Sequence, residues 1–63
     1  MQIDLNGQRI TTAAPTLAAL LTEQGFDPAS VATALDSAFV PRSLRAATAL
    51  SAGVKVEVLS RMQ

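Results

Sequence analysis

The strongest helical pattern in the chain is only about two turns long, and this length restricts the fold. Thr16 is a good N-cap for a helix over residues 17–24, and Gly25 and Phe26 then match the glycine and apolar residue of a helix C-terminus. Three leucines at helical spacing form one apolar stripe: Leu17, Leu20 and Leu21. Because so short a helix is not stable alone in water, the sequence predicts that it packs on a β-sheet.

The first twelve residues predict the first hairpin of that sheet. Ile3 and Leu5 alternate with polar residues, and a second strand-like run begins at Arg9. Between the two runs stands Asn6-Gly7, a pair that favours a type I′ turn because both central residues need positive φ. We therefore expect Ile3 and Leu5 to face the leucine stripe, together with Val56 and Val58 of the last strand.

The rest of the chain predicts three more strands. Residues 31–35 and 39–40 flank a tight turn, and valines alternate with other residues over 54–59. Residues 27–30 form a connector, and Ser43 is expected to cap a short helical turn over 44–48. The order is thus two strands, a helix, two strands, a short helix and a strand. Strands joined through a helix usually pair in parallel, so we predict an α+β, β-grasp (ubiquitin-like) domain: a mixed four- to five-stranded sheet packed on one main helix.

Composition excludes most kinds of chemistry. The 63 residues contain no Cys, His, Trp or Tyr, which excludes disulfides, thiolate nucleophiles, imidazole bases and zinc sites with Cys or His ligands. Two phenylalanines are too few for a base-stacking surface, and the longest apolar run, residues 17–21, is far too short to span a membrane. No secretory signal opens the chain. We expect a cytoplasmic protein that is not an enzyme, with no catalytic residue, metal or cofactor and no nucleic-acid or membrane partner.

The charges are balanced in number but not in position. Residues 1–36 hold four acidic residues and one basic residue, net −3, whereas residues 37–63 hold four basic residues and one acidic residue, net +3. Such a dipolar domain suits docking on a charged protein surface. The alternative is an ordinary surface of solvated charges.

Two regions are candidates for contact with a partner. Leu59 is out of phase with the valines of its strand, so its side chain is expected on the sheet face opposite the helix, grouped with Phe39 or Val40. The alternative is a single exposed leucine without a role. After residue 59 the domain is expected to end in a flexible polar tail: Ser60, Arg61, Met62 and Gln63.

Several segments, in this order and spacing, resemble the sulfur carrier proteins of the ThiS/MoaD branch of ubiquitin-like proteins. They are Met1-Gln2-Ile3 with Asn6-Gly7, Thr16-Leu17-Ala18-Ala19-Leu20-Leu21, Val31-Ala32-Thr33-Ala34-Leu35, Phe39-Val40-Pro41-Arg42-Ser43, and Val56-Glu57-Val58-Leu59 before Met62-Gln63. The Val-Pro-Arg element after a hairpin is the most specific of them. The Met-Gln ending favours the thiamine branch of the family over the small subunit of molybdopterin synthase.

The resemblance implies a function for the tail. In this family the tail continues as Gly-Gly, and an E1-like, ATP-dependent adenylyltransferase activates the terminal carboxylate. The adenylate becomes a thiocarboxylate that donates sulfur to thiazole synthase. The given chain stops at Gln63, just before the expected Gly-Gly. The sequence therefore leaves two hypotheses open, a sulfur carrier that needs those glycines and a β-grasp module that only binds a partner.

Overall fold

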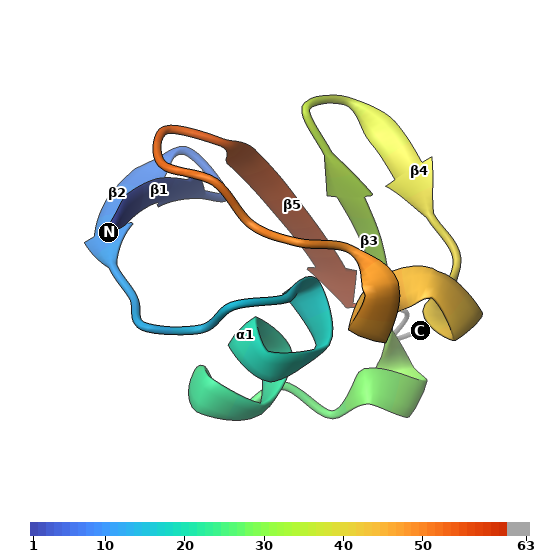
Figure 1. Cartoon of the computed structure of the whole chain (residues 1–63). Helices are drawn as coiled ribbons and strands as arrows, with labels where there is room; N and C mark the ends of the chain where they lie inside the picture. Colours follow the sequence, from blue (N-terminus) through green and yellow to red (C-terminus); the bar gives the residue numbers. More distant parts are fainter. Residues whose placement is uncertain (61–63) are drawn as a thin grey trace.

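In the computed structural model of the protein, which describes residues 1–60, one mixed sheet packs on one helix (Figure 1). Its order is β2-β1-β5-β3-β4, with β1 and β5 parallel and the other neighbours antiparallel. The strands are β1 (Gln2–Leu5), β2 (Gln8–Thr11), β3 (Val31–Leu35), β4 (Ala38–Val40) and β5 (Lys55–Ser60). The predicted α+β, β-grasp architecture is confirmed, with five strands.

Both predicted hairpins have tight turns with positive φ. Asn6 and Gly7 have φ of 52° and 83°, as the Asn-Gly pair predicts. The second turn has no glycine, yet Asp36 and Ser37 have φ of 49° and 72°. Asp36 is held there by β5, because its backbone N–H donates to the Lys55 carbonyl at 2.7 Å and its Oδ1 accepts from the Lys55 N–H at 3.0 Å. These bonds offset the cost of left-handed backbone at residues other than glycine.

The main helix, α1 (Leu17–Glu23), begins and ends as predicted. The hydroxyl of Thr16 caps it by accepting a hydrogen bond from the first turn at 3.2 Å. At its end Gly25 has φ of 81°, and the N–H of Phe26 donates to the carbonyl of Leu21 at 2.9 Å. This is the Schellman motif, which satisfies carbonyl groups that the helix leaves unpaired.

Two 3-10 helices differ from the prediction. The expected connector contains η1 (Pro28–Ser30), which Asp27 caps by accepting from the Ala29 N–H and from the Ser30 hydroxyl. The expected helical turn over 44–48 is instead η2 (Arg42–Ala47), which begins after Pro41 and has no side-chain cap. Its bonds span three residues, as from the Leu44 N–H to the Pro41 carbonyl. Ser43 therefore does not cap it.

The core lies between α1 and the sheet face that α1 covers (Figure 1). The helix stripe and the inward residues of β1 and β5 belong to one cluster, as predicted. Its buried residues are Ile3, Leu5, Ala14, Leu17, Leu20, Leu21, Val31, Val40, Leu50, Val54, Val56 and Val58.

One basic residue is also buried. Arg45 of η2 is only 4% exposed, although its residue type is typical of surfaces. Its guanidinium donates to the carbonyl oxygens of Pro28 and Val31 at 2.9 and 2.8 Å, and to the Thr33 hydroxyl at 3.0 Å. That hydroxyl donates in turn to the Val40 carbonyl at 2.9 Å. Arg45 thus joins η1, β3, β4 and η2 at the end of the sheet.

Candidate functional site

The sheet face that points away from α1, called here the outer face, has two parts of different character. Strand register places charged side chains over β2, β1 and the first half of β5, and apolar side chains over β3, β4 and the end of β5. The charged side chains are Asp4, Arg9, Lys55 and Glu57. The apolar patch consists of Ala32, Ala34, Phe39 and Leu59.

Two large and two small side chains make up the apolar patch. Phe39 lies opposite Ala34 on β3, and Leu59 lies opposite Ala32. Phe39 and Leu59 are each 67% exposed, so both large side chains extend into solvent. Between them lies a shallow depression of about 90 Å³, which Thr33 and Glu57 also line. Strand alternation predicted the outward position of Leu59, and Phe39 or Val40 was expected beside it. The two alanines were not predicted.

Val40 does not belong to this surface. It is 8% exposed, and its side chain is part of the core. Successive residues of a strand point to opposite faces, so the exposure of Phe39 places Val40 on the inner face. The expectation that Val40 faces a partner is therefore wrong.

Ser60 is also placed differently from the prediction. It is the last residue of β5 and pairs with Val31, so it belongs to the sheet and not to a separate tail. A strand ladder is formed by backbone groups, and a polar side chain at an exposed position does not end it. The other predicted tail residues, Arg61, Met62 and Gln63, lie outside the described residues.

The apolar patch and the end of the described chain are adjacent. Leu59 of the patch directly precedes Ser60, from which the chain continues to Gln63. β5 starts beside the charged part of the outer face and ends in the patch. A protein that binds the C-terminal residues is therefore brought close to the patch.

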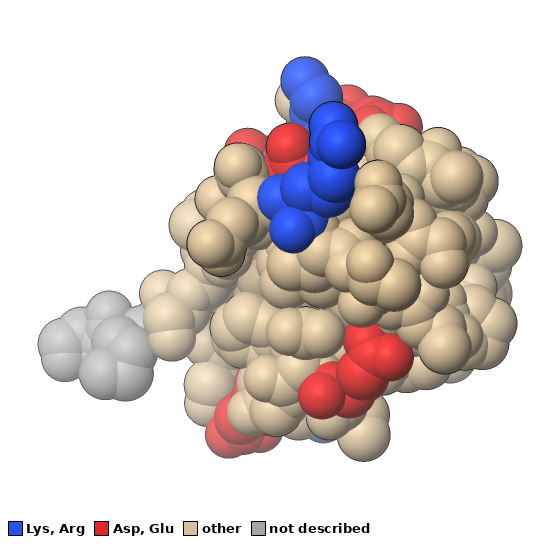
Figure 2. Space-filling model, turned by 90° about the vertical axis from the view of Figure 1, so that its left-hand side faces the viewer, with Lys and Arg blue, Asp and Glu red and all other residues tan. Residues whose placement is uncertain are grey.

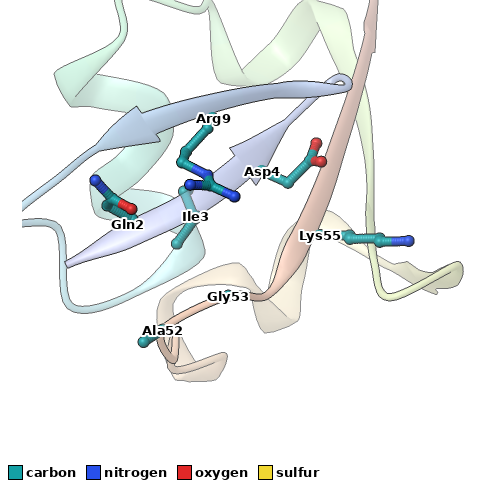
Figure 3. Close-up of a pocket in the computed structure, with 7 residues that line it drawn as sticks. All are labelled: Gln2, Ile3, Asp4, Arg9, Ala52, Gly53 and Lys55. Atoms are coloured by element: carbon teal, nitrogen blue, oxygen red, sulfur yellow. The ribbon is translucent and has the colours of Figure 1, made fainter.

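A larger depression lies at the other end of the outer face. It measures about 630 Å³ and is lined by Gln2, Ile3, Asp4, Arg9, Ala52, Gly53 and Lys55. Figure 3 shows Arg9 reaching from β2 across β1, whereas the Lys55 side chain extends away from it. Asp4 accepts a hydrogen bond from the Gly7 N–H at 2.8 Å, so this carboxylate supports the hairpin turn. In Figure 2 basic side chains gather at the top of the view, the side of the molecule that holds the sheet, with acidic side chains beside them; other acidic side chains lie at the bottom.

Two carboxyl groups away from the outer face have altered acidity. Hydrogen bonds from the Thr12 hydroxyl, and more weakly from Gln24 and the Ala13 N–H, lower the pKa of Glu23. The pKa of Asp27 is lowered by its cap bonds to the Ala29 N–H and the Ser30 hydroxyl. Both groups hold chain segments together, and neither lies beside a second acid in the depressions of the outer face.

Among residues 1–60 no group of three or more acidic, His or Cys side chains is arranged to hold a metal ion. No helix in this part of the chain has the length and apolarity needed to cross a membrane.

Comparisons with known proteins bear on the fold and on the family of the chain. No curated protein sequence matches the chain. Among solved structures it is similar to the thiamine biosynthesis protein (ThiS) from Geobacter metallireducens, with a TM-score of 0.89 and 24% identity over 100% of this chain and 97% of that one. This likeness establishes the shared fold. The family model described as the ThiS family matches residues 3–63, nearly the whole sequence. The chain therefore belongs to the ThiS family.

Proposed function

We propose that the protein is a sulfur carrier for thiazole formation in thiamine biosynthesis and acts as a protein substrate, not as an enzyme. The observation that carries this proposal is the family match over residues 3–63. The β-grasp fold shared with a thiamine biosynthesis protein (ThiS) supports it.

The proposed chemistry takes place on the C-terminal carboxylate. A carboxylate is a poor electrophile, so it first attacks the α-phosphorus of ATP on an adenylyltransferase and releases pyrophosphate. A sulfur nucleophile then displaces AMP from the acyl carbon, leaving a thiocarboxylate that donates its sulfur to thiazole synthase. This sequence uses no Cys or His of the carrier, consistent with a chain that has neither.

A Gly-Gly ending suits this chemistry for a steric reason. Glycine has no side chain, so the backbone can pass through a narrow channel and approach the nucleotide closely. Gln63, the last residue of the given sequence, would bring a side chain into that channel. We therefore propose that the carrier form needs two glycines after Gln63.

The exposed part of the predicted partner surface, Phe39 and Leu59, is proposed to contact the adenylyltransferase and thiazole synthase. Exposed apolar side chains gathered on one face are typical of a protein interaction site. Their position directly before the C-terminal residues supports this assignment, because one partner can then bind both.

ATP–pyrophosphate exchange with the cognate adenylyltransferase tests the proposal. The chain ending at Gln63 should bind the enzyme and give no exchange, whereas the chain with Gly-Gly appended should give exchange. With a sulfur source, it should also gain the mass expected for replacing one oxygen by sulfur. A chain with Ala-Ala appended is the matched control for length. No exchange after glycine addition would contradict the carrier function and leave a binding module. Efficient exchange by the chain ending at Gln63 would contradict the need for the two glycines.

A further inference from the structure

We propose that the depression in the apolar patch is a socket for one protruding aliphatic side chain of the adenylyltransferase, and that Ala32 and Ala34 determine which side chains fit. This inference rests on the proposed function, because it names how the partner recognises the carrier. It adds two specificity-determining residues that belong neither to the tail nor to the core.

The shape of the depression supports a single inserted side chain. The two alanines form its floor, while Phe39 and Leu59, each 67% exposed, form its walls. Its volume of about 90 Å³ is smaller than the roughly 150 Å³ of a cavity that binds benzene. It therefore has room for one branched aliphatic side chain such as leucine. Apolar side chains inserted into such pockets commonly supply most of the binding energy of an interface.

The alanines are not explained by the stability of the sheet. Strands favour β-branched and aromatic residues, and β3 follows this rule at its buried positions, Val31 and Thr33. At its outward positions it has Ala32 and Ala34, each opposite a large residue on a neighbouring strand. A larger residue there would gain cross-strand contacts and would fill the depression. Small side chains thus keep the socket open at some cost in stability.

The position of the socket identifies its occupant. Leu59 is both a wall of the socket and the residue before Ser60, where the described chain ends. An enzyme that acts on the C-terminal carboxylate must bind the residues that follow Ser60, and its surface then lies over this end of the sheet. The adenylyltransferase is therefore the occupant we propose. A second copy of the chain, or the chain's own C-terminal residues, are the competing occupants.

Filling the socket tests the inference. In Ala34→Leu the leucine should occupy the depression, so affinity for the adenylyltransferase, measured by titration calorimetry, should fall about tenfold or more. The thermal midpoint should stay equal or rise, because leucine suits a strand better than alanine. Ala34→Gly keeps the socket open and should bind nearly as well as the parent. Thr11→Leu, exposed on the same face at the β2 edge, is the matched control and should bind like the parent.

Turnover separates the socket from the tail chemistry. With Gly-Gly appended, Ala34→Leu should require a higher carrier concentration for half-maximal exchange but reach the parent's maximal rate, because its tail is unchanged. Parent-like affinity of Ala34→Leu would overturn the inference while the carrier function stood. Binding of the parent, together with no exchange after Gly-Gly is appended, would overturn the carrier function alone, and absence of binding would overturn both.

Sedimentation of the free protein tests the competing occupants. We expect a monomer for both the parent and Ala34→Leu. A parent dimer that Ala34→Leu dissociates, with enzyme binding unchanged, would assign the socket to a second copy. If deleting residues 61–63 strengthened enzyme binding to the parent but not to Ala34→Leu, the chain's own end would be the occupant. Either result would overturn the inference.

Discussion

The side-chain amide of Asn6 forms two hydrogen bonds with the backbone of Val58. Its Oδ1 accepts from the Val58 N–H at 2.8 Å, and its Nδ2 donates to the Val58 carbonyl at 3.1 Å. The last backbone hydrogen bond between β1 and β5 runs from the Asn6 N–H to the Val56 carbonyl at 2.9 Å. At Val58 the Asn6 side chain therefore makes the bonds that a further residue of β1 would make, although the chain has already turned at Asn6. It ties the first hairpin to the strand that carries the apolar patch.

Asn6→Asp should lower the free energy of unfolding by about 1–3 kcal/mol, because the carbonyl of the buried Val58 loses its hydrogen-bond donor. Aspartate tolerates the positive φ at this position, so the change removes mainly the bond to the Val58 carbonyl. Urea unfolding at neutral pH measures the effect. Gln8→Glu, which also puts a carboxylate on an exposed residue of this hairpin, is the control and should change little. Equal stability of Asn6→Asp and the parent would contradict a role for the amide.

Leu20→Ala should destabilise the domain by about 2–5 kcal/mol, because it leaves a cavity at a fully buried position of α1. For a domain of 63 residues this is a large share of the total. Urea unfolding of Leu20→Ala should therefore show a much lower midpoint. Thr22→Ala, at an exposed position of the same helix, should keep nearly the parent midpoint. Similar midpoints for both variants would mean that the leucine stripe contributes little to the core.

Arg45→Lys should lower the free energy of unfolding by at least about 2 kcal/mol, because each hydrogen bond from a charged group contributes about 1.5–3 kcal/mol to stability. Lysine keeps the charge but lacks the planar fork that reaches Pro28, Val31 and Thr33 together. Arg42→Lys, at an exposed position of η2, should be nearly neutral. Thermal unfolding of the two variants side by side makes the comparison. Equal midpoints would show that a positive charge alone is sufficient at residue 45.

Local patterns predicted most of the fold, and the errors arose where distant residues decide the structure. The Asn-Gly turn, the Thr16 cap and the Gly25 ending follow from neighbours in sequence, so their signals were clear. The burial of Arg45 depends on carbonyl groups 14 and 17 residues away, which no local pattern reveals. Ser60 belongs to β5 because Val31 offers it a backbone partner, although its side chain is polar.

The candidate site was predicted only in part, for a similar reason. The alternation of β5 predicted that Leu59 points outward, and Phe39 or Val40 was expected beside it. The depression between Phe39 and Leu59 exists only because β3 pairs with β4 on one side and with β5 on the other. Its two alanines then lie between Phe39 of β4 and Leu59 of β5. The sequence signal was the outward Ala32 and Ala34 in a strand that otherwise carries Val, Thr and Leu.

Acid should weaken the fold through Glu23. Its pKa is lowered in the folded protein, mainly by the Thr12 hydroxyl, from an ordinary value of 4.5. Its stabilising effect is therefore complete above about that pH and is lost as the pH falls through the lower folded value. Glu23→Gln should remove this part of the acid-side decline in the free energy of unfolding, measured between neutral pH and pH about 3. Glu57→Gln removes one exposed carboxylate of β5 and is the control. An unchanged acid-side decline in Glu23→Gln would contradict this role.

Leu59→Asp should abolish binding to the adenylyltransferase while changing stability by no more than about 0.5 kcal/mol, as is usual for exposed positions. The leucine is 67% exposed, so little core packing is lost, but the new carboxylate would lose its hydration inside an apolar interface. Titration calorimetry gives the affinity, and thermal unfolding checks that the domain is intact. Leu44→Asp, at a 53% exposed leucine of η2 outside the patch, is the matched control and should bind like the parent. If Leu59→Asp also bound like the parent, the partner would not contact this end of the sheet; if both variants lost binding, the interface would extend beyond the patch to η2.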